Sequence, residues 1–548
     1  MPHPLSETLS LTVLLVAGWL FLRRRRHRTV LDNIPGPQAR SWTTGSLDDI
    51  WNRRGWDYHR KIAETYGSIL RVKGLFGAND LYIFDPKALQ HILIKGQDIF
   101  EETETFLETN KIIYGDGIFT TLGDRHHHQR KMLNSIFSIA HLREMVPIFY
   151  GVTSRLRKTF STLTQSGPAE VDILVWTTRL SLELIGQAGL GYTFDDLEQG
   201  SVPHAYGLAS KELLPLVAEA SALMRNPLVP YIARMGPPRF RRFLVDWLPI
   251  KQIHRVRNIV DTLHNTSVEI YEAKKQALEQ GDAALAAQSG GGKDIITNLM
   301  KANLRTSDDD KLSEKEILGQ ITSLTFAATD TTSSALCRTI HLLSIHKDVQ
   351  KRLREEIRSA RDSAGGEDLS YDTFMSLPYL DAICKETLRL YPPIATFMRN
   401  ARQDAILPLS APIKGIDGTD FHEIHVPKGT DVFVSVISSN RNPQVWGPDA
   451  YEWNPERWLQ PLPESVLNAR IPGVLPHLLT FFAGGRSCIG FKFAQLEMKV
   501  VLTLLVEGFE FSPSVDKDIV WQMTSITTPN LDFESTVPTL PIIITRAA

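Results

Sequence analysis

One uninterrupted helix of about nine turns, at roughly 3.6 residues per turn, most constrains how this chain can fold. Ser313-Glu314-Lys315-Glu316 has the pattern of a capping box, in which the serine hydroxyl and the last glutamate satisfy each other's backbone donors. From there to about His346, no proline or glycine pair ends the helix. A helix of this length normally crosses the whole body of a protein, so we expect a mainly α-helical fold built around it.

The middle of this helix is small and rich in hydroxyl groups, where a core helix is usually aliphatic. Residues 325–334 read Thr-Phe-Ala-Ala-Thr-Asp-Thr-Thr-Ser-Ser. Hydroxyl groups inside a helix compete with its backbone hydrogen bonds, and close packing between helices is one interpretation of such a run. The other is a proton-delivery site, because Asp330 and the adjacent alcohol Thr331 can hold water in an apolar pocket and pass protons to a bound oxidant.

A second pattern surrounds Cys488 in residues 481–490, which read Phe-Phe-Ala-Gly-Gly-Arg-Ser-Cys-Ile-Gly and precede an apolar run with helical spacing. The end of a helix favours a thiolate over a thiol, and Arg486 offers a forked cation suited to a carboxylate. Gly484 and Gly490 remove Cβ atoms where the backbone turns or approaches something closely. A lone cysteine is often only a small buried hydrophobe. This combination instead suits a flat, dianionic iron porphyrin bound through sulfur.

Two charged residues on one helix form the third pattern. Glu386 and Arg389 are three residues apart and share a helix face, in a segment that also carries apolar residues and ends at Tyr391-Pro392-Pro393. Most such pairs are exposed and contribute little. Burial becomes favourable if a second arginine joins them.

Length and composition narrow the class of protein. A chain of 548 residues exceeds the usual size of one hydrophobic core, so we expect two lobes or one large domain. A net charge of -2 argues against a nucleic-acid partner. Three cysteines without disulfide or metal-ligand spacing fit a reducing compartment.

The N-terminus reads as a membrane anchor. An apolar stretch, residues 8–22, is followed at once by arginines, which is the reverse of the order in a cleaved signal peptide. We therefore predict an uncleaved single-pass transmembrane helix with its basic flank in residues 1–28. A proline-rich linker would follow in residues 29–46, and a catalytic domain in residues 47–548. The positive-inside rule places that domain in the cytosol.

Several shorter segments give weaker indications. Two strand-like runs in residues 69–84 precede a helix start at Asp85-Pro86, which predicts a small β-lobe. Residues 100–122 lack periodicity and read as a functional loop, whereas residues 123–141 read as one helix with a basic face. Residues 239–247 mix arginines with aromatic residues, typical either of an amphipathic helix on the core or of membrane contact. Residues 509–544 read as β-structure.

In this order, the three patterns resemble the cytochrome P450 monooxygenases, of the membrane-anchored, microsomal, fungal-like type. The loop matches the family's Phe-x-x-Gly-x-Arg-x-Cys-x-Gly at every fixed position. The long helix resembles the family's Ala/Gly-Gly-x-Asp/Glu-Thr-Thr/Ser motif, with Ala328 where glycine is usual, so its methyl group narrows the groove beside the oxygen site. Glu386 and Arg389 match Glu-x-x-Arg. The resemblance runs from about residue 34 to the C-terminus.

The resemblance implies the cytochrome P450 fold, which is mainly α-helical with a small β-lobe and holds haem b between the long helix and the cysteine loop. It also implies the endoplasmic reticulum membrane as the location, and a role for each matching residue. Cys488 would be the axial thiolate ligand of the iron. The residues implied in cofactor binding are Cys488, Arg486, Arg130, Arg399, His126, Phe481, Gly484 and Gly490, with His126 standing where the family has a tryptophan. Asp330 and Thr331 would be catalytic. The ion pairs that lock the loop would join Glu386, Arg389 and Arg457. The substrate pocket would be lined by Phe119, Phe326, Ala327, Ile394, Phe397 and Ile526.

The implied reaction is insertion of one atom of dioxygen into a lipophilic small molecule, by hydroxylation or epoxidation, in terpenoid or other secondary metabolism. Electrons would come from a membrane-bound, NADPH-dependent flavoprotein reductase, with Lys131, Arg143, Lys492 and Lys499 as candidate docking cations. A haem-thiolate isomerase or dehydratase and a non-catalytic haem sensor are the alternatives. NADPH consumption with turnover of a substrate separates the three.

Overall fold

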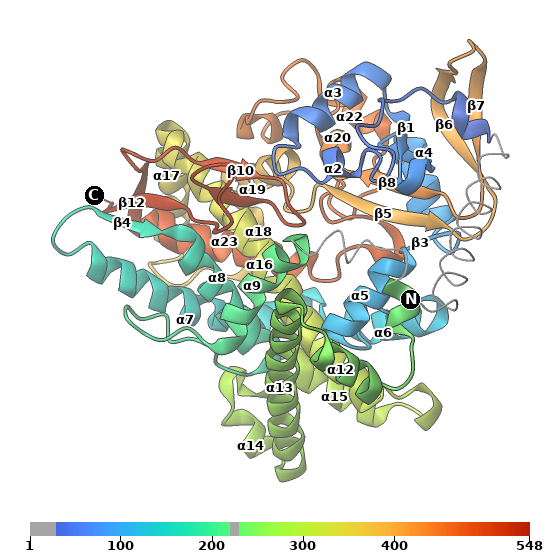
Figure 1. Ribbon diagram of the computed structural model, residues 1–548. Coiled ribbons are helices and arrows are strands. Elements are labelled where there is room, and N and C mark those ends of the chain that lie inside the picture. The colour runs from blue at the N-terminus through green and yellow to red at the C-terminus, as the bar shows by residue number, and fades with distance from the viewer. Residues whose placement is uncertain (1–28, 220–228, 548) are drawn as a thin grey trace.

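The computed structural model describes residues 29–219 and 229–547, and shows a large helical body joined to a smaller lobe that contains the main sheet (Figure 1). The prediction of a mainly α-helical protein with a small β-lobe is confirmed. The predicted N-terminal anchor lies outside the described residues. Within the described ranges, no helix has both the length and the apolar composition needed to cross a membrane.

Most of the longer helices form the body, whereas the first of them packs on the strands of the β-lobe (Figure 1). They are α3 (Trp56–Tyr66), α5 (Glu104–Tyr114), α6 (Gly123–Ile136), α7 (Ile139–Leu163), α8 (Ile173–Leu184), α9 (Ala205–Glu219), α12 (Pro238–Trp247), α13 (Lys251–Gln280), α15 (Ile295–Arg305), α16 (Glu314–Ile345), α17 (Lys347–Ser363), α19 (Pro378–Leu390) and α23 (Phe491–Gly508). Shorter helices connect them: α2 (Leu47–Ile50), α4 (Pro86–Gln90), α11 (Val229–Ala233), α14 (Asp282–Ala286), α18 (Tyr371–Ser376), α20 (Val436–Asn440), α21 (Pro443–Trp446) and α22 (Glu464–Ala469).

Helix α16 is the predicted central helix. The Ser313 hydroxyl accepts from the backbone N–H of Glu316, and the Glu316 carboxylate accepts from the backbone N–H of Ser313 at 2.9 Å, so the predicted capping box is formed. The helix ends at Ile345, one residue before the predicted end. It packs against α8, α13, α19 and α23, and 22 of its 32 residues are buried.

The β-lobe is built on a five-stranded sheet in the order β1-β2-β8-β5-β3. Its strands are β1 (Ile69–Lys73), β2 (Asn79–Ile83), β3 (Phe100–Glu101), β5 (Thr396–Ala401) and β8 (Asp431–Ser435). The predicted pair β1 and β2 is antiparallel, with Ile69 opposite Ile83. The predicted helix start also holds, because the Asp85 carboxylate accepts from the Ala88 N–H at 2.9 Å.

Three smaller sheets complete the fold. They contain β4 (Ala169–Asp172) with β12 (Pro541–Arg546) and β9 (Phe509–Pro513), β6 (Ala405–Lys414) with β7 (Asp420–Val426), and β10 (Val520–Gln522) with β11 (Thr528–Asn530). Four of these strands lie in residues 509–546, which confirms the β-structure predicted for the C-terminal region.

Two local predictions were wrong. Residues 104–114 form helix α5, capped by the Thr103 hydroxyl, and not an irregular loop. The hydrophobic pattern did not reveal this helix, because the apolar residues Phe106 and Ile112 are exposed. They obscure the helical spacing of seven residues between the buried Leu107 and Tyr114. The helix predicted for residues 123–141 is two helices, because the Ser138 hydroxyl caps a new start at Ile139.

The segment predicted as a linker packs on the β-lobe. Leu31 and Ile34 are almost fully buried, and the Pro35 carbonyl accepts from the Arg71 N–H at 2.9 Å. A Cβ atom at Gly36 would lie 1.8 Å from the Arg71 carbonyl oxygen, so the backbone there is pressed against β1. The fixed part of the fold therefore starts before residue 47.

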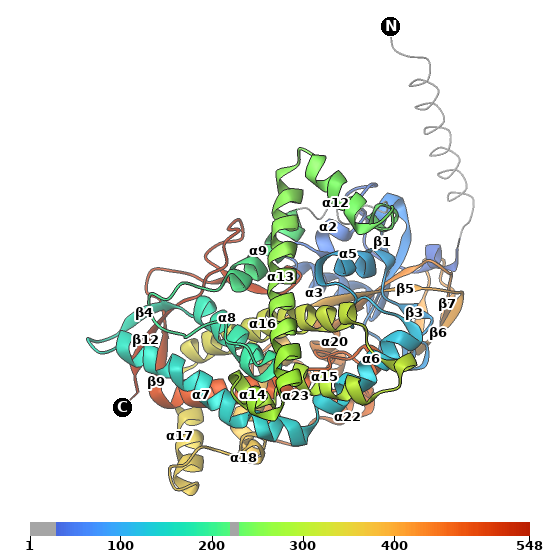
Figure 2. The same ribbon diagram turned by 90° about the horizontal axis from the view of Figure 1, so that it is seen from below.

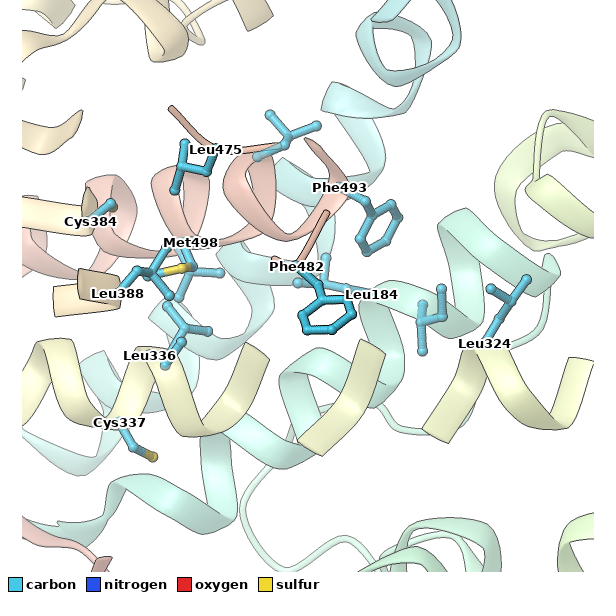
Figure 3. Close-up of a cluster of buried hydrophobic side chains, with 14 of the residues drawn as sticks. Leu184, Leu324, Leu336, Cys337, Cys384, Leu388, Leu475, Phe482, Phe493 and Met498 are labelled. Atoms are coloured by element: carbon cyan, nitrogen blue, oxygen red, sulfur yellow. The ribbon is translucent and has the colours of Figure 1, made fainter. Parts of the chain in front are cut away.

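The hydrophobic core beneath the site joins α8, α16, α19 and α23 (Figure 3). Leu184, Leu336, Leu388 and Met498 contribute one side chain from each helix. Phe482 comes from the cysteine loop and lies between α23 and α16 in Figure 3. The loop is therefore anchored in the same core that fixes α16.

Candidate functional site

The cysteine loop is a tight structure closed by its own backbone. The N–H of Cys488 donates to the carbonyl of Phe481 at 2.9 Å. Gly484 has φ +66°, and a Cβ there would lie 1.8 Å from the Leu93 carbonyl oxygen, so both its conformation and its packing require glycine. Gly490 has an ordinary φ of -89°, and its Cβ position is 3.9 Å from Phe137, so the protein atoms alone do not require glycine there.

Cys488 differs from the other two cysteines. Cys337 and Cys384 are buried, whereas Cys488 is exposed. Burial nevertheless raises the pKa of its thiol to about 11, although a backbone N–H and Arg130 act in the opposite direction. An accessible but desolvated thiol lies in a recess inside the protein. The expectation that the helix end alone favours the thiolate was wrong, because desolvation outweighs it; a coordinated metal deprotonates a thiol outright.

One face of α16 is open within an otherwise buried helix. The partly exposed residues in its middle are Phe326, Ala327, Ala328, Asp330 and Thr331. Thr325, Thr329 and Thr332, on the other side, are buried. Spacings of three and four residues place 326, 327, 330 and 331 on one broad face. The acid and alcohol predicted from sequence therefore lie on the accessible face of this helix.

Asp330 is an acid with a pKa near neutrality. Burial raises its pKa to about 7, opposed by the nearby Lys211 of α9. Burial also lowers the pKa of Lys211. The Thr331 hydroxyl donates to the Ala327 carbonyl of its own helix at 2.7 Å. Sequence patterns missed Lys211, because it lies on a helix far from Asp330 along the chain.

Three arginines gather beside the loop from three different elements. Arg130 of α6 donates to the Ser487 carbonyl and hydroxyl at 2.7 and 2.8 Å. Arg486 donates to the carbonyls of Ile118 and Thr121 at 3.3 and 2.7 Å. Arg399 of β5 is 5% exposed. Burial lowers the pKa of all three, and Arg486 further lowers the pKa of the other two.

His126 lies beside this cluster as a neutral side chain. It is buried, and desolvation together with Arg486 and Arg130 lowers its pKa to about 3. A neutral imidazole can still donate one hydrogen bond. The substitution of histidine for the family's tryptophan is therefore compatible with a donor at this position.

Glu102 was missed by the sequence analysis. Its carboxylate lies 3.1 Å from Arg399 and 3.2 Å from Arg486, and its side chain is 9% exposed. It is the carboxylate that pairs with the arginine cluster. No local pattern marks it, because its partners come from residues about 300 and 380 positions further along the chain.

The predicted buried triad is present. Glu386 and Arg389 are both fully buried and joined by two hydrogen bonds of 2.8 Å. Arg457 approaches the same carboxylate at 3.4 Å and also pairs with Asp449 at 2.7 Å. Trp458 donates to Glu386 at 2.9 Å. One carboxylate is thus satisfied by several donors, which is the condition for keeping a charge buried.

The triad connects to the cysteine loop through two residues that the sequence analysis did not single out. Arg389 donates to the Asn440 carbonyl at 3.1 Å. The Asn440 amide donates to Thr480 and accepts from the Leu479 N–H, both at 2.8 Å. These contacts reach the residue immediately before Phe481.

Three of the predicted pocket residues are aromatic and pack against other rings, and the other three are aliphatic. Phe119 and Phe326 surround Tyr114 of α5, with ring centroids 6.2 and 4.8 Å from it. Phe397 packs on Phe482 of the cysteine loop at 4.4 Å. Ala327 and Ile394 are partly exposed, whereas Ile526 is 5% exposed and lies in the core. Tyr114 is an additional aromatic residue at this site.

The candidate docking cations differ in accessibility. Lys131 and Arg143 are exposed, and Lys492 is partly exposed. Lys499 is 1% exposed and pairs with Asp381 of α19 at 2.8 Å, so its assignment to a docking surface was wrong.

The cluster fits a dianionic porphyrin. Arg130, Arg399 and Arg486 carry three positive charges, and Glu102 supplies one negative charge, which leaves a surplus of two positive charges. Buried charge without compensation is costly. Two carboxylate groups on a cofactor would balance this surplus, beside an accessible cysteine that can bind its metal.

Comparisons with known proteins agree with this fit. A family model described as cytochrome P450 matches residues 35–536. Cytochrome P450 monooxygenase 91 of Postia placenta is 46% identical, over 98% of each chain. Ganoderic acid synthetase of Ganoderma lucidum is 41% identical, over 96% of this chain and 97% of that one. A cytochrome P450 crystal structure with 22% identity has a TM-score of 0.68, over 94% of this chain and 99% of the other. The chain therefore belongs to the cytochrome P450 family, as a monooxygenase whose cofactor is a haem held by a cysteine thiolate.

Proposed function

We propose that this protein inserts one atom of dioxygen into a lipophilic small molecule of secondary metabolism, with electrons from an NADPH-dependent reductase. The observation that carries the proposal is the accessible Cys488 beside the cluster of Arg130, Arg399 and Arg486. Aromatic and aliphatic residues around Tyr114 and Phe397 favour an apolar substrate. The similarity to a ganoderic acid synthetase supports a terpenoid as the first class to test.

Each site residue has a proposed task. Cys488 would hold the iron of the haem, and Arg130, Arg399, Arg486 and His126 would donate hydrogen bonds to its carboxylate groups. Phe481, Gly484 and Gly490 shape the loop, and the backbone bond to Phe481 fixes the position of Cys488. The bound haem supplies the chemistry of oxygen activation.

Asp330 and Thr331 would hold and deliver protons from the open face of α16. A pKa of about 7 suits an acid that must release and regain protons near neutral pH. The Thr331 hydroxyl is held by the Ala327 carbonyl, which leaves its oxygen lone pairs to accept from water or from Asp330.

Replacing Asp330 with asparagine will lower product formation by about 10²-fold or more, because a positioned acid typically contributes that much. Thr331→Val will divert NADPH consumption into hydrogen peroxide. Thr329→Val is the matched control: Thr329 makes the same type of bond, to the Thr325 carbonyl at 2.7 Å, but on the buried side. The assay measures NADPH, peroxide and product with a terpenoid selected by its shift of the haem absorption band. Equal coupling in Thr331→Val and Thr329→Val contradicts the assignment, and product formed without NADPH contradicts the reaction class.

We propose that the protein works at the endoplasmic reticulum membrane, with its catalytic domain in the cytosol and residues 1–28 as anchor. A second contact is supported by α12, which lies at one end of α13 in Figure 2 and exposes Phe240, Phe243 and Trp247 beside its arginines. Apolar rings with flanking cations suit the headgroup region. In a protein lacking residues 1–28, Phe243→Asp will weaken liposome binding, whereas Leu304→Asp on α15, an equally exposed position, will not. If the parent truncated protein does not bind liposomes, α12 has no membrane role.

A further inference from the structure

Glu102 stands opposite a propionate-binding arginine because of strand register. Strands β3 and β5 pair antiparallel, with Phe100 opposite Ala401 and Glu101 opposite Asn400. Continuing this register by one residue places Glu102 opposite Arg399, and their side chains meet at 3.1 Å. The second carboxylate oxygen of Glu102 lies 3.2 Å from Nε of Arg486.

Neither arginine depends on Glu102 for its position. Arg399 donates to the Met398 carbonyl at 2.7 Å, and its guanidinium lies 4.7 Å from the centre of the Phe482 ring. Arg486 is held by the carbonyls of Ile118 and Thr121. The contact of Glu102 with Arg486 is an ion pair without hydrogen-bond alignment, since that carboxylate oxygen has no hydrogen-bond partner. The contribution of Glu102 is therefore mainly its charge.

The negative charge of Glu102 lies in a poorly solvated part of the protein. Glu102 is 7% exposed, Arg399 is 5% exposed, and the side chain of Arg486 is 16% exposed. Electrostatic interactions are stronger and less screened by salt in such surroundings than at the surface. The neighbouring Glu101 pairs with Arg402 at 3.8 Å and acts on Arg399 and Arg486 only at longer range.

We propose that Glu102 is a built-in third carboxylate of the propionate site, which lowers the reduction potential of the haem by opposing the field of Arg399 and Arg486. This inference rests on the proposed role of those two arginines. A fixed negative charge beside the haem stabilises the ferric over the ferrous state, because reduction adds an electron to the same region. Glu102 thus acts through the field at the haem and touches no substrate.

The test is a spectroelectrochemical titration of the substrate-free, haem-loaded protein. Glu102→Gln will shift the reduction potential to a more positive value, and Glu102→Asp, which keeps the charge, will stay close to the parent protein. Glu104→Gln is the matched control, because Glu104 is two residues away, half exposed, and pairs with Arg402 and Arg234 at 3.9 Å. Its shift will be smaller than that of Glu102→Gln.

An unchanged potential in Glu102→Gln, or an equal shift in Glu104→Gln, overturns the proposal. If Glu102→Gln fails to retain haem, the Glu102→Asp variant becomes the test. Haem retained at the parent potential in Glu102→Asp supports a role of the charge, whereas loss of haem in both variants overturns the proposal. The titration uses neither substrate nor reductase. An enzyme without turnover would therefore contradict the proposed function but not this result, and an unchanged potential would leave the proposed function intact.

Discussion

Replacing Cys488 with serine will abolish the carbon monoxide absorption spectrum that is typical of a reduced thiolate-bound haem, and with it all monooxygenase activity. A serine hydroxyl remains protonated and cannot replace a soft thiolate as an iron ligand. The surrounding loop should survive, because its bond from residue 488 to Phe481 uses backbone atoms and Gly484 is untouched. The measurement is the difference spectrum of the purified, reduced protein with and without carbon monoxide.

Cys384→Ser supplies the matched control. Cys384 is buried on α19, where desolvation raises the pKa of its thiol to about 12, and it lies in the core cluster of Figure 3. This variant should lose some stability but keep the thiolate spectrum. A thiolate spectrum that persists in Cys488→Ser would falsify the ligand assignment.

Local sequence patterns predicted the parts of the site whose determinants are close together in the chain. The Ser313 capping box, the Glu386–Arg389 pair and the glycine turn at Gly484 each depend on residues within a few positions of one another. Arg457 was found only through the family resemblance, and the structure places it 3.4 Å from Glu386.

The missed residues acquire their roles from pairing across the fold. Glu102 reaches Arg399 through the β3–β5 register, and Asn440 links Arg389 to the loop from a separate short helix. Lys499 shows the opposite error. We predicted an exposed lysine at a docking surface, but Lys499 is buried and pairs with Asp381 of α19. Charge alone does not reveal which side of a helix is covered by a neighbour.

Glu386→Gln will destabilise the protein by about 3–5 kcal/mol, the typical cost of leaving a buried charge without its partner. Arg389 is fully buried and would keep its backbone carbonyl acceptors at Asn440, Ala450 and Glu452 and the single amide oxygen of the glutamine, but no opposite charge. The loss of the Glu386 charge affects Arg457 less, since Asp449 still pairs with it at 2.7 Å. The measurement is the free energy of unfolding in urea, followed by tryptophan fluorescence.

Replacing Glu456 with glutamine separates the effect of burial on stability from the effect of losing a charge. Glu456 lies seventy residues further along, next to Arg457, but its ion pair with Arg352 is about half exposed, so Glu456→Gln should cost no more than about 1 kcal/mol. Glu386→Gln should also lose haem more readily than Glu456→Gln. Asn440 and Thr480 transmit the position of Arg389 to the residue before Phe481, so a displaced Arg389 loosens the loop that carries Cys488. Equal unfolding energies and equal haem retention in the two variants would show that the triad does not support the loop.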